Sequence, residues 1–301
     1  MAPQISLQTY ALFLALGSTL AFSASSLVYS EYSSRVSVLW MNCFKAFVAF
    51  CLLCLTIPLF FGGWHHAEPM VVALFIASGL IGLNIADLFL LNAFTKIGPA
   101  RTLMFFGFQP LMIGIGAKFF FGQEMNPAKL LAVFFMIGCL FTLSFENYRV
   151  HKKWAISGLV IAFIAVALDA CGILITRSAF EMTAEVTPIE GHFYRCIGAL
   201  IGFAIMSMFR PLPLIKGFMQ WSPRVRLLLL VASFGGTFLS LLLYMNAVKI
   251  GHLASLAGIT ITGPMFAASL ECAIKRKWPS RYLLVAFGFF ACGFYVLVAS
   301  S

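Results

Sequence analysis

The chain has 301 residues, of which 61% are hydrophobic and 10% charged, and its mean hydropathy is +0.98. A soluble globular domain carries charge on about a quarter of its residues, so a water-soluble fold is excluded. The formal net charge is +10, but the bases stand singly or in short clusters between apolar runs, which argues against a nucleic-acid partner and favours a role in membrane orientation.

Apolar segments long enough to cross a membrane follow one another along the whole chain. A hydrocarbon core of about 30 Å takes roughly 20 residues of helix. We expect ten spans, at residues 8 to 29, 35 to 61, 70 to 93, 99 to 121, 127 to 145, 154 to 178, 187 to 209, 226 to 249, 252 to 274 and 280 to 299. Their continuous apolar character is unlike the alternating pattern of membrane strands. The sequence therefore predicts an all-α integral membrane protein with ten transmembrane helices.

An internal repeat divides these spans into two halves. Residues 92 to 110 read NAFTKIGPARTLMFFGFQP and residues 246 to 264 read NAVKIGHLASLAGITITGP, each with a proline 18 positions after the asparagine. Five spans in each half is an odd number, so the second half must enter the membrane the other way up. We expect two inverted five-helix repeats, at residues 1 to 148 and 154 to 301.

The segment from 92 to 146 also carries a family resemblance. Its turn NAFTKIGPA, the mid-helix Pro110 and the run FFFGQEMNPAKLLAVFFMIGCLFTL resemble the drug/metabolite transporter superfamily, of the EamA-like ten-helix type. The second half departs from the family pattern after Pro264, where Lys275-Arg276-Lys277 replaces the Gly-x-Glu loop. The resemblance implies a bundle with a central cavity formed by both halves, transport of small metabolites and no cofactor.

Four ionisable residues fall inside predicted spans, at Lys45, Asp87, Asp169 and Arg195. Each costs about 2.5–3.5 kcal/mol on insertion scales, so such residues normally face the protein interior or a wet cavity. Lys45 and Arg195 fall where the resembled family has an arginine in the second helix of each repeat. Either these groups pair with one another to fix helix packing, or they bind substrate or a proton.

Uncharged polar residues mark further inward faces. Asn84 precedes Asp87 by three residues, on the same face of an α-helix. Gln109 and Tyr244 belong to polar stripes in the fourth and eighth spans, whereas the fifth and tenth spans have almost none and read as peripheral. The candidate cavity residues are Lys45, Asn84, Asp87, Gln109, Asp169, Arg195 and Tyr244.

Pro110 and Pro264 occupy equivalent places in the fourth and ninth spans. A missing amide donor and a ring clash are expected to kink each helix. The kinks fit either a fixed curvature or a gate that opens alternately on the two sides.

Charge counts predict an orientation. Fourteen of the twenty bases follow odd-numbered spans, four lie on the other side, and Lys45 and Arg195 remain inside. The positive-inside rule therefore places both termini outside the cytoplasm. The family resemblance implies both termini inside.

These observations favour a secondary transporter that moves a small polar or amphipathic solute, such as an amino acid, by alternating access. If a proton is exchanged, Asp87 or Asp169 is the candidate carrier. A channel or membrane scaffold is the alternative. No HExxH, GxSxG or phosphate-binding glycine loop points to an enzyme, and no metal site is expected, because His65 and His66 read as polar loop residues.

Overall fold

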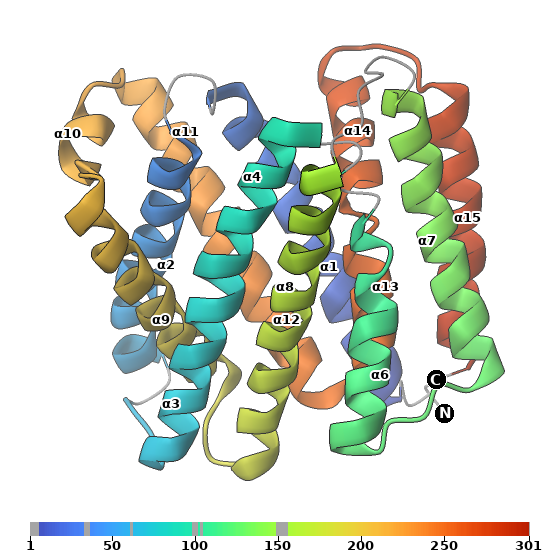
Figure 1. Ribbon diagram of the computed structural model, residues 1–301, viewed down its shortest axis with the longest axis horizontal. Coiled ribbons are helices and arrows are strands. Elements are labelled where there is room, and N and C mark those ends of the chain that lie inside the picture. The colour runs from blue at the N-terminus through green and yellow to red at the C-terminus, as the bar shows by residue number, and fades with distance from the viewer. Residues whose placement is uncertain are drawn as a thin grey trace.

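The computed structural model describes residues 6–32, 37–60, 63–97, 102, 105–148 and 156–300, and the account below concerns these residues. They form a bundle of helices that run roughly parallel to one another (Figure 1). Nine helical stretches within them are long and apolar enough to cross a membrane. The sequence predictions of an all-α fold and of a multi-pass membrane protein are confirmed.

The helices of the first half follow the predicted order. They are α1 (Leu7–Tyr32), α2 (Val38–Phe60), α3 (Pro69–Ser78), the π-helical segment η1 (Gly79–Ala86), α4 (Asp87–Ile97), α6 (Gln109–Phe121) and α7 (Pro127–Tyr148). Segments α3, η1 and α4 form one continuous span. The expected fourth span, 99 to 121, lies partly outside the described residues, and α6 is its described part.

The second half repeats this order with one addition. Its helices are α8 (Ile156–Met182), α9 (Pro188–Phe209), α10 (Leu214–Met219), α11 (Pro223–Ser233), the π-helical η2 (Phe234–Leu239), α12 (Ser240–Ile250), α13 (Leu253–Thr260), α14 (Gly263–Ile274) and α15 (Arg281–Ala299). The addition is the short helix α10. Segments α11, η2 and α12 form one span, and so do α13 and α14.

Local sequence explains several helix ends. The hydroxyl of Thr187 accepts from the amide of Glu190 while the Glu190 side chain accepts from the amide of Thr187, which is a capping box at the start of α9. At the start of α15 the Ser280 side chain accepts from the amide of Leu283, which is a simple N-cap. Helix α6 ends at Gly122, whose φ of 63° favours glycine.

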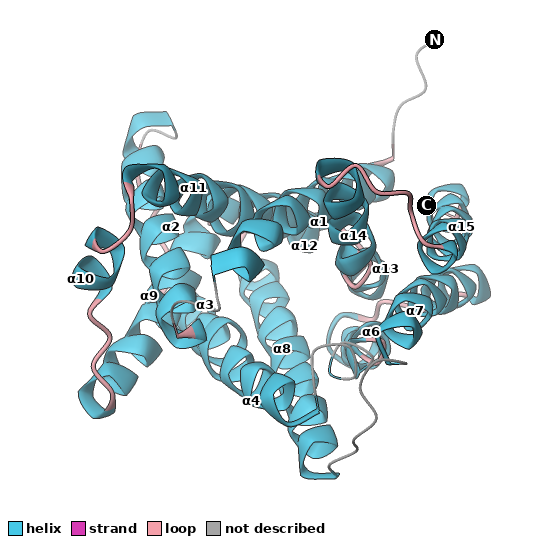
Figure 2. Cartoon of the chain, turned by 90° about the horizontal axis from the view of Figure 1, so that it is seen from above, coloured by secondary structure: helices cyan, strands magenta, loops and turns pink. Residues whose placement is uncertain are grey.

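The two halves interlock through their third spans. Segments α3 and η1 pack against α8 and α9 of the second half, while α11 and η2 pack against α1 and α2 of the first half. The remaining spans meet their counterparts, α6 against α13 and α7 against α15, the last pair at one edge of the bundle (Figures 1 and 2). Each half therefore supplies part of the packing surface of the other.

Glycines permit the close approach of η1 to α8 and α9. A Cβ atom on Gly172 of α8 would lie 3.0 Å from the Cα of Gly82 in η1. A Cβ atom on Gly198 of α9 would lie 2.0 Å from the carbonyl oxygen of Ile76 in α3. Because real Cβ atoms do not approach backbone atoms this closely, only glycine allows these helix axes to lie at the observed separation.

Bases divide unequally between the two ends of the bundle. We call the end where α1 begins and α15 ends the termini face, and the opposite end, which carries α10 and the α14–α15 connection, the basic face (Figure 1). The described bases of the basic face are Lys96, Arg210, Lys216, Arg224, Arg226, Lys275, Arg276, Lys277 and Arg281. Those of the termini face are Lys118, Lys129, Arg177 and Lys249.

Candidate functional site

The ionisable residues of the interior come from four different spans. Lys45 lies on α2, Asp87 begins α4 directly after η1, Asp169 lies on α8 and Arg195 on α9. Lys45 and Arg195 occupy matching positions, because each lies seven residues after the first residue of its helix, Val38 and Pro188 respectively. The fold thus brings one base from the second helix of each half toward the third span of the first half.

Arg195 is buried but incompletely paired. Its side chain is 3% exposed, Nη1 donates a hydrogen bond to the hydroxyl of Thr176, and Nε has no hydrogen-bond partner. Among the described residues, no carboxylate oxygen lies within 4.0 Å of its guanidinium. Burial of a charged group without a close counter-ion is costly, so this guanidinium retains an unused capacity to bind an anion.

Asp169 and Gln109 meet beside this guanidinium. The side-chain amide of Gln109, the first residue of α6, donates a hydrogen bond to Oδ2 of Asp169. A Cβ atom placed on Gly82 of η1 would lie 3.6 Å from Nη2 of Arg195 and 3.8 Å from Oδ1 of Asp169. The carboxylate and the guanidinium therefore converge on the same glycine, and Asp169 keeps part of its surface accessible.

Lys45 and Asp87 form a second group next to the first. The ammonium of Lys45 lies 5.1 Å from the ring centroid of Tyr29 and interacts electrostatically with Asp87, although no oxygen of Asp87 lies within 4.0 Å of it. Asp87 also interacts with Asp169, which links the two groups. Lys45 and Asp87 are both only partly buried.

Tyr244 and Asn84, the other two candidates, have different surroundings. Tyr244 is 8% exposed and lies within electrostatic range of Asp169 and Arg195, so it borders the site. Asn84 is 2% exposed and its amide donates to the carbonyl of Ala199 in α9 over 3.5 Å. Asn84 therefore contacts α9, whereas Asp87 interacts with Lys45 of α2.

The helix is interrupted immediately before both prolines. Pro110 is the second residue of α6 and follows a turn at residues 107 and 108, and Pro264 is the second residue of α14 and follows a turn at residues 261 and 262. The residue before each proline contacts the first span of the other half: Gln109 bonds Asp169 of α8, and the carbonyl of Gly263 accepts from Ser23 of α1 over 2.9 Å.

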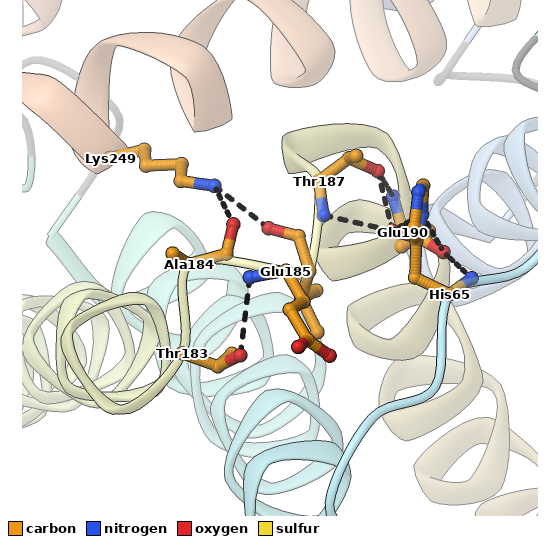
Figure 3. A network of polar contacts seen from close by, with 8 residues as sticks. His65, Thr183, Ala184, Glu185, Thr187, Glu190 and Lys249 are labelled. Carbon is orange, nitrogen blue, oxygen red and sulfur yellow. Dashed lines mark hydrogen bonds and ion pairs between the residues drawn. The ribbon is translucent and has the colours of Figure 1, made fainter.

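Polar contacts within the second half join α12 to α8 and to the α8–α9 connection at the termini face (Figure 3). The ammonium of Lys249, near the end of α12, donates to the carbonyls of Ala184 and Val186 over 3.2 and 2.9 Å in the α8–α9 connection. Arg177 of α8 donates in return to the carbonyls of Val248 and Lys249. Helix α12 is thereby fixed to α8 and to the start of α9.

Glu190 adds a second closure at the same face (Figure 3). Its carboxylate accepts from the amide of His65 over 2.7 Å and from the amide of Thr187 over 2.8 Å, and it lies 3.2 Å from Nδ1 of His65. The α2–α3 connection is thus joined to the first turn of α9. His65, which the sequence analysis interprets as a polar loop residue, contacts Glu190 here.

Sequence reasoning missed the closing role of Lys249 and Arg177, because it counted them only as loop charges. A signal was present for Lys249, which belongs to the Lys-Ile-Gly of the repeat motif. For Arg177, no sequence pattern indicates that the acceptors are backbone carbonyls of α12. Two cavities of the described chain lie away from the interior charges, one beside α10 and one at the termini face.

Comparison with known proteins agrees with this architecture. The model of the EamA-like transporter family matches residues 9–145. A solved structure titled only "Crystal structure of protein" has a TM-score of 0.79 over 96% of each chain at 15% identity, which shows a shared fold, and 28 chains of solved structures match in all. A search of curated proteins gave no match.

Proposed function

We propose that this multi-pass membrane protein, whose residues 9–145 match the model of the EamA-like transporter family, is a transporter of the drug/metabolite transporter type. It moves a small zwitterionic metabolite such as an amino acid by alternating access. The two proposed inverted repeats are residues 1 to 148 and 154 to 301. Members of this family are transporters rather than enzymes, and the chemistry required of the site is binding and release.

The observation that carries the proposal is the convergence of charged side chains from both halves around η1. Two bases and two acids lie in one interior region, and neither base has a carboxylate oxygen of the described residues within 4.0 Å. Pairs built only for helix packing would be expected to make direct ion pairs, since isolated charges are expensive inside a membrane. Separated charges of both signs are instead suited to a ligand that carries both.

The charges suggest how such a ligand is held. The guanidinium of Arg195 is the proposed partner of the substrate carboxylate, because its Nε has no protein acceptor. The carboxylates of Asp87 and Asp169, two residues that are only partly buried, are the proposed partners of the ammonium group. Gln109 orients Asp169 through its hydrogen bond, and Tyr244 and Lys45 border the same region.

Contacts at the termini face support alternating access. Helix α12 packs there against α8 and α9, and its Lys249 bonds the α8–α9 connection. Interlocked repeats can exchange conformations, so that a contact present at one end in one state is replaced by its counterpart at the other end. The interruptions before Pro110 and Pro264 are the proposed points of bending.

Uptake into proteoliposomes tests the proposal. We expect saturable counterflow of at least one amino acid from a panel of zwitterions, and a loss of at least tenfold in kcat/KM for Arg195→Met, whereas Lys118→Met, which removes an exposed base far from the site, leaves kcat/KM unchanged. Ohmic currents without counterflow would identify a channel. Equal uptake by both variants would remove Arg195 from the site.

A proton is the proposed coupling ion, with Asp87 or Asp169 as its carrier. Counterflow is then expected to lose its pH dependence in Asp87→Asn or in Asp169→Asn. Unchanged pH dependence in both variants would exclude these carboxylates as the carriers.

A further inference from the structure

One cavity of the described chain lies where α10 meets α2 near the basic face, and Figure 1 shows α10 at the outer side of the bundle. Its volume is about 650 Å³, which falls within the range of about 300–1,000 Å³ typical of ligand sites. We call it the α2–α10 groove. The groove is lined by Phe47, Leu212, Pro213, Leu214, Ile215, Lys216 and Met219.

The wall of the groove is held by specific contacts. The indole Nε1 of Trp40 donates to the carbonyl of Pro213 over 3.2 Å, which fixes the chain just before α10. The Phe44 ring stacks on Trp40 at 5.0 Å and on Phe218 of α10 at 5.1 Å. Helix α10 is therefore anchored to α2, and the groove between them is a built feature of the fold.

The groove surface is apolar and open toward the lipid. The side chains of Phe47, Ile215 and Met219 are 43%, 74% and 58% exposed. Phe47 lies nine residues inside α2 from its first residue Val38, about 14 Å at 1.5 Å per residue. The apolar lining thus extends from the membrane interface into the depth reached by acyl chains.

Two bases are placed at this groove, because Lys216 lines it and Arg226 contacts its lining residue Met219. The segment from 210 to 226 contains Arg210, Lys216, Arg224 and Arg226 and no acidic residue. None of these bases makes an ion pair among the described residues. Nη1 of Arg226 lies 3.4 Å from the sulfur of Met219 at the groove, and Nε of Arg226 is buried without a hydrogen-bond partner.

We propose that the α2–α10 groove binds an anionic phospholipid from the leaflet at the basic face. An acyl chain lies along Phe47, Ile215 and Met219, and the phosphate is held by Lys216 and Arg226. The positive-inside rule makes this leaflet the cytoplasmic one, whose anionic lipids attract basic segments at the membrane surface. The absence of acids from residues 210 to 226 gives the charge complementarity that a zwitterionic lipid would not need.

Lipid titration of the purified protein tests the site. Phosphatidylglycerol is expected to raise the thermal unfolding midpoint more than phosphatidylcholine with identical chains, and native mass spectrometry should show phosphatidylglycerol retained preferentially. The double variant Lys216→Gln/Arg226→Gln is expected to bind phosphatidylglycerol more weakly, by roughly fivefold for each base removed. The matched control is Lys275→Gln/Lys277→Gln, which removes two exposed bases from the same face outside the groove.

Each other outcome overturns the proposal. Equal weakening in the control would mean that the whole basic face attracts lipid. Equal stabilisation by inorganic phosphate would make the ligand a free anion, and the absence of any preference in the wild-type protein would exclude an anionic-lipid site. If the double variant does not fold, phosphatidylglycerol binding is measured with Ile215→Ser instead. The lipid selectivity of the wild-type protein in native mass spectrometry is a second test, and it needs no variant.

Discussion

The lysines in the two copies of the Lys-Ile-Gly motif have different contacts in the structure. Lys249, in the second copy, donates to two carbonyls of the α8–α9 connection, whereas Lys96, in the first copy, is exposed at the other end of the bundle. Helix α12 packs against α8 and α9, while α4 has no comparable packing against α1 or α2 among the described residues. The two similar segments therefore differ in their contacts. The second copy is bonded to the α8–α9 connection at the termini face, and the lysine of the first copy is exposed at the basic face.

Under the proposed alternating access, this asymmetry corresponds to one of two conformations, in which the termini face is closed. In the other conformation the third spans would pack at the basic face instead. The conformation with the basic face closed would place α4 against α1 and α2, as α12 now lies against α8 and α9.

The largest effect is expected at the interface of the third span of the first half. In Gly198→Ala, the new Cβ would lie 2.0 Å from the carbonyl oxygen of Ile76, a backbone atom that cannot rotate away. We expect a loss of about 1–3 kcal/mol or more in stability, from overpacking, seen as a lower thermal unfolding midpoint in detergent. Gly288→Ala is the control, since a Cβ there meets nothing within 4 Å.

A smaller effect is expected from Lys249→Met, which removes two hydrogen bonds from a charged donor. A buried bond of this kind contributes about 1.5–3 kcal/mol. Lys249 is only partly buried, so solvent screening reduces the two bonds together to about the value of one. The contacts at the termini face should therefore open roughly ten- to a hundredfold more often. The measurement is maleimide labelling of Val186→Cys, a fully buried position, followed at that residue by mass spectrometry. Lys96→Met should leave the rate unchanged, and an equal increase in both variants would contradict the asymmetry.

Acidification should weaken the termini face selectively. His252, between α12 and α13, lies 3.2 Å from the carbonyl of Glu124 through Nε2, while Nδ1 accepts from the amide of Ser255. Burial first, and then the charge of Lys129, lowers the pKa of His252 from its ordinary 6.5 to about 4. The unfolded chain therefore binds this proton more readily than the folded one, and stability falls as the pH decreases from about 6.5 toward 4.

For one proton, the free energy of unfolding changes by at most about 1.4 kcal/mol per pH unit. Thermal unfolding midpoints measured from pH 7 to pH 5 check this pH dependence. His252→Asn retains a capping side chain and cannot titrate, so its midpoint should vary less with pH. An unchanged pH dependence would assign the titration to other groups. The motif places Pro99 at the matching position of the first half, so no such titration is expected there.

The smallest effect is expected in the third span of the second half. In Gly235→Ala the new Cβ would lie 2.9 Å from Oγ of Ser25, a side-chain atom that can move to another rotamer. We expect a loss below about 1 kcal/mol, well under that of Gly198→Ala, in the same unfolding measurement. Equal losses would show that both third spans are packed with the same tightness.

Much of the architecture was predictable because a membrane imposes simple rules on sequence. Apolar length and proline or glycine breaks placed most spans within a few residues, and Pro110 and Pro264 marked the interruptions before α6 and α14. The relation of Asn84 to Asp87 was not predictable in this way. Asn84 lies in the π-helical η1, where the wider turn changes which residues share a face, and it reaches α9 while Asp87 interacts with Lys45.

By itself, the sequence determined that this is an all-α membrane protein with an internal repeat, and which few ionisable residues lie within its spans. Hydropathy and repetition are properties of the chain read in order, so no partner is needed to recognise them. Only the tertiary structure decided that Asp169 accepts a hydrogen bond from Gln109 and lies with Arg195 beside Gly82. It also decided that Lys249 donates to backbone carbonyls, whereas Lys96 is exposed. These contacts join segments far apart in sequence, and their partners are often backbone atoms, which carry no side-chain signal.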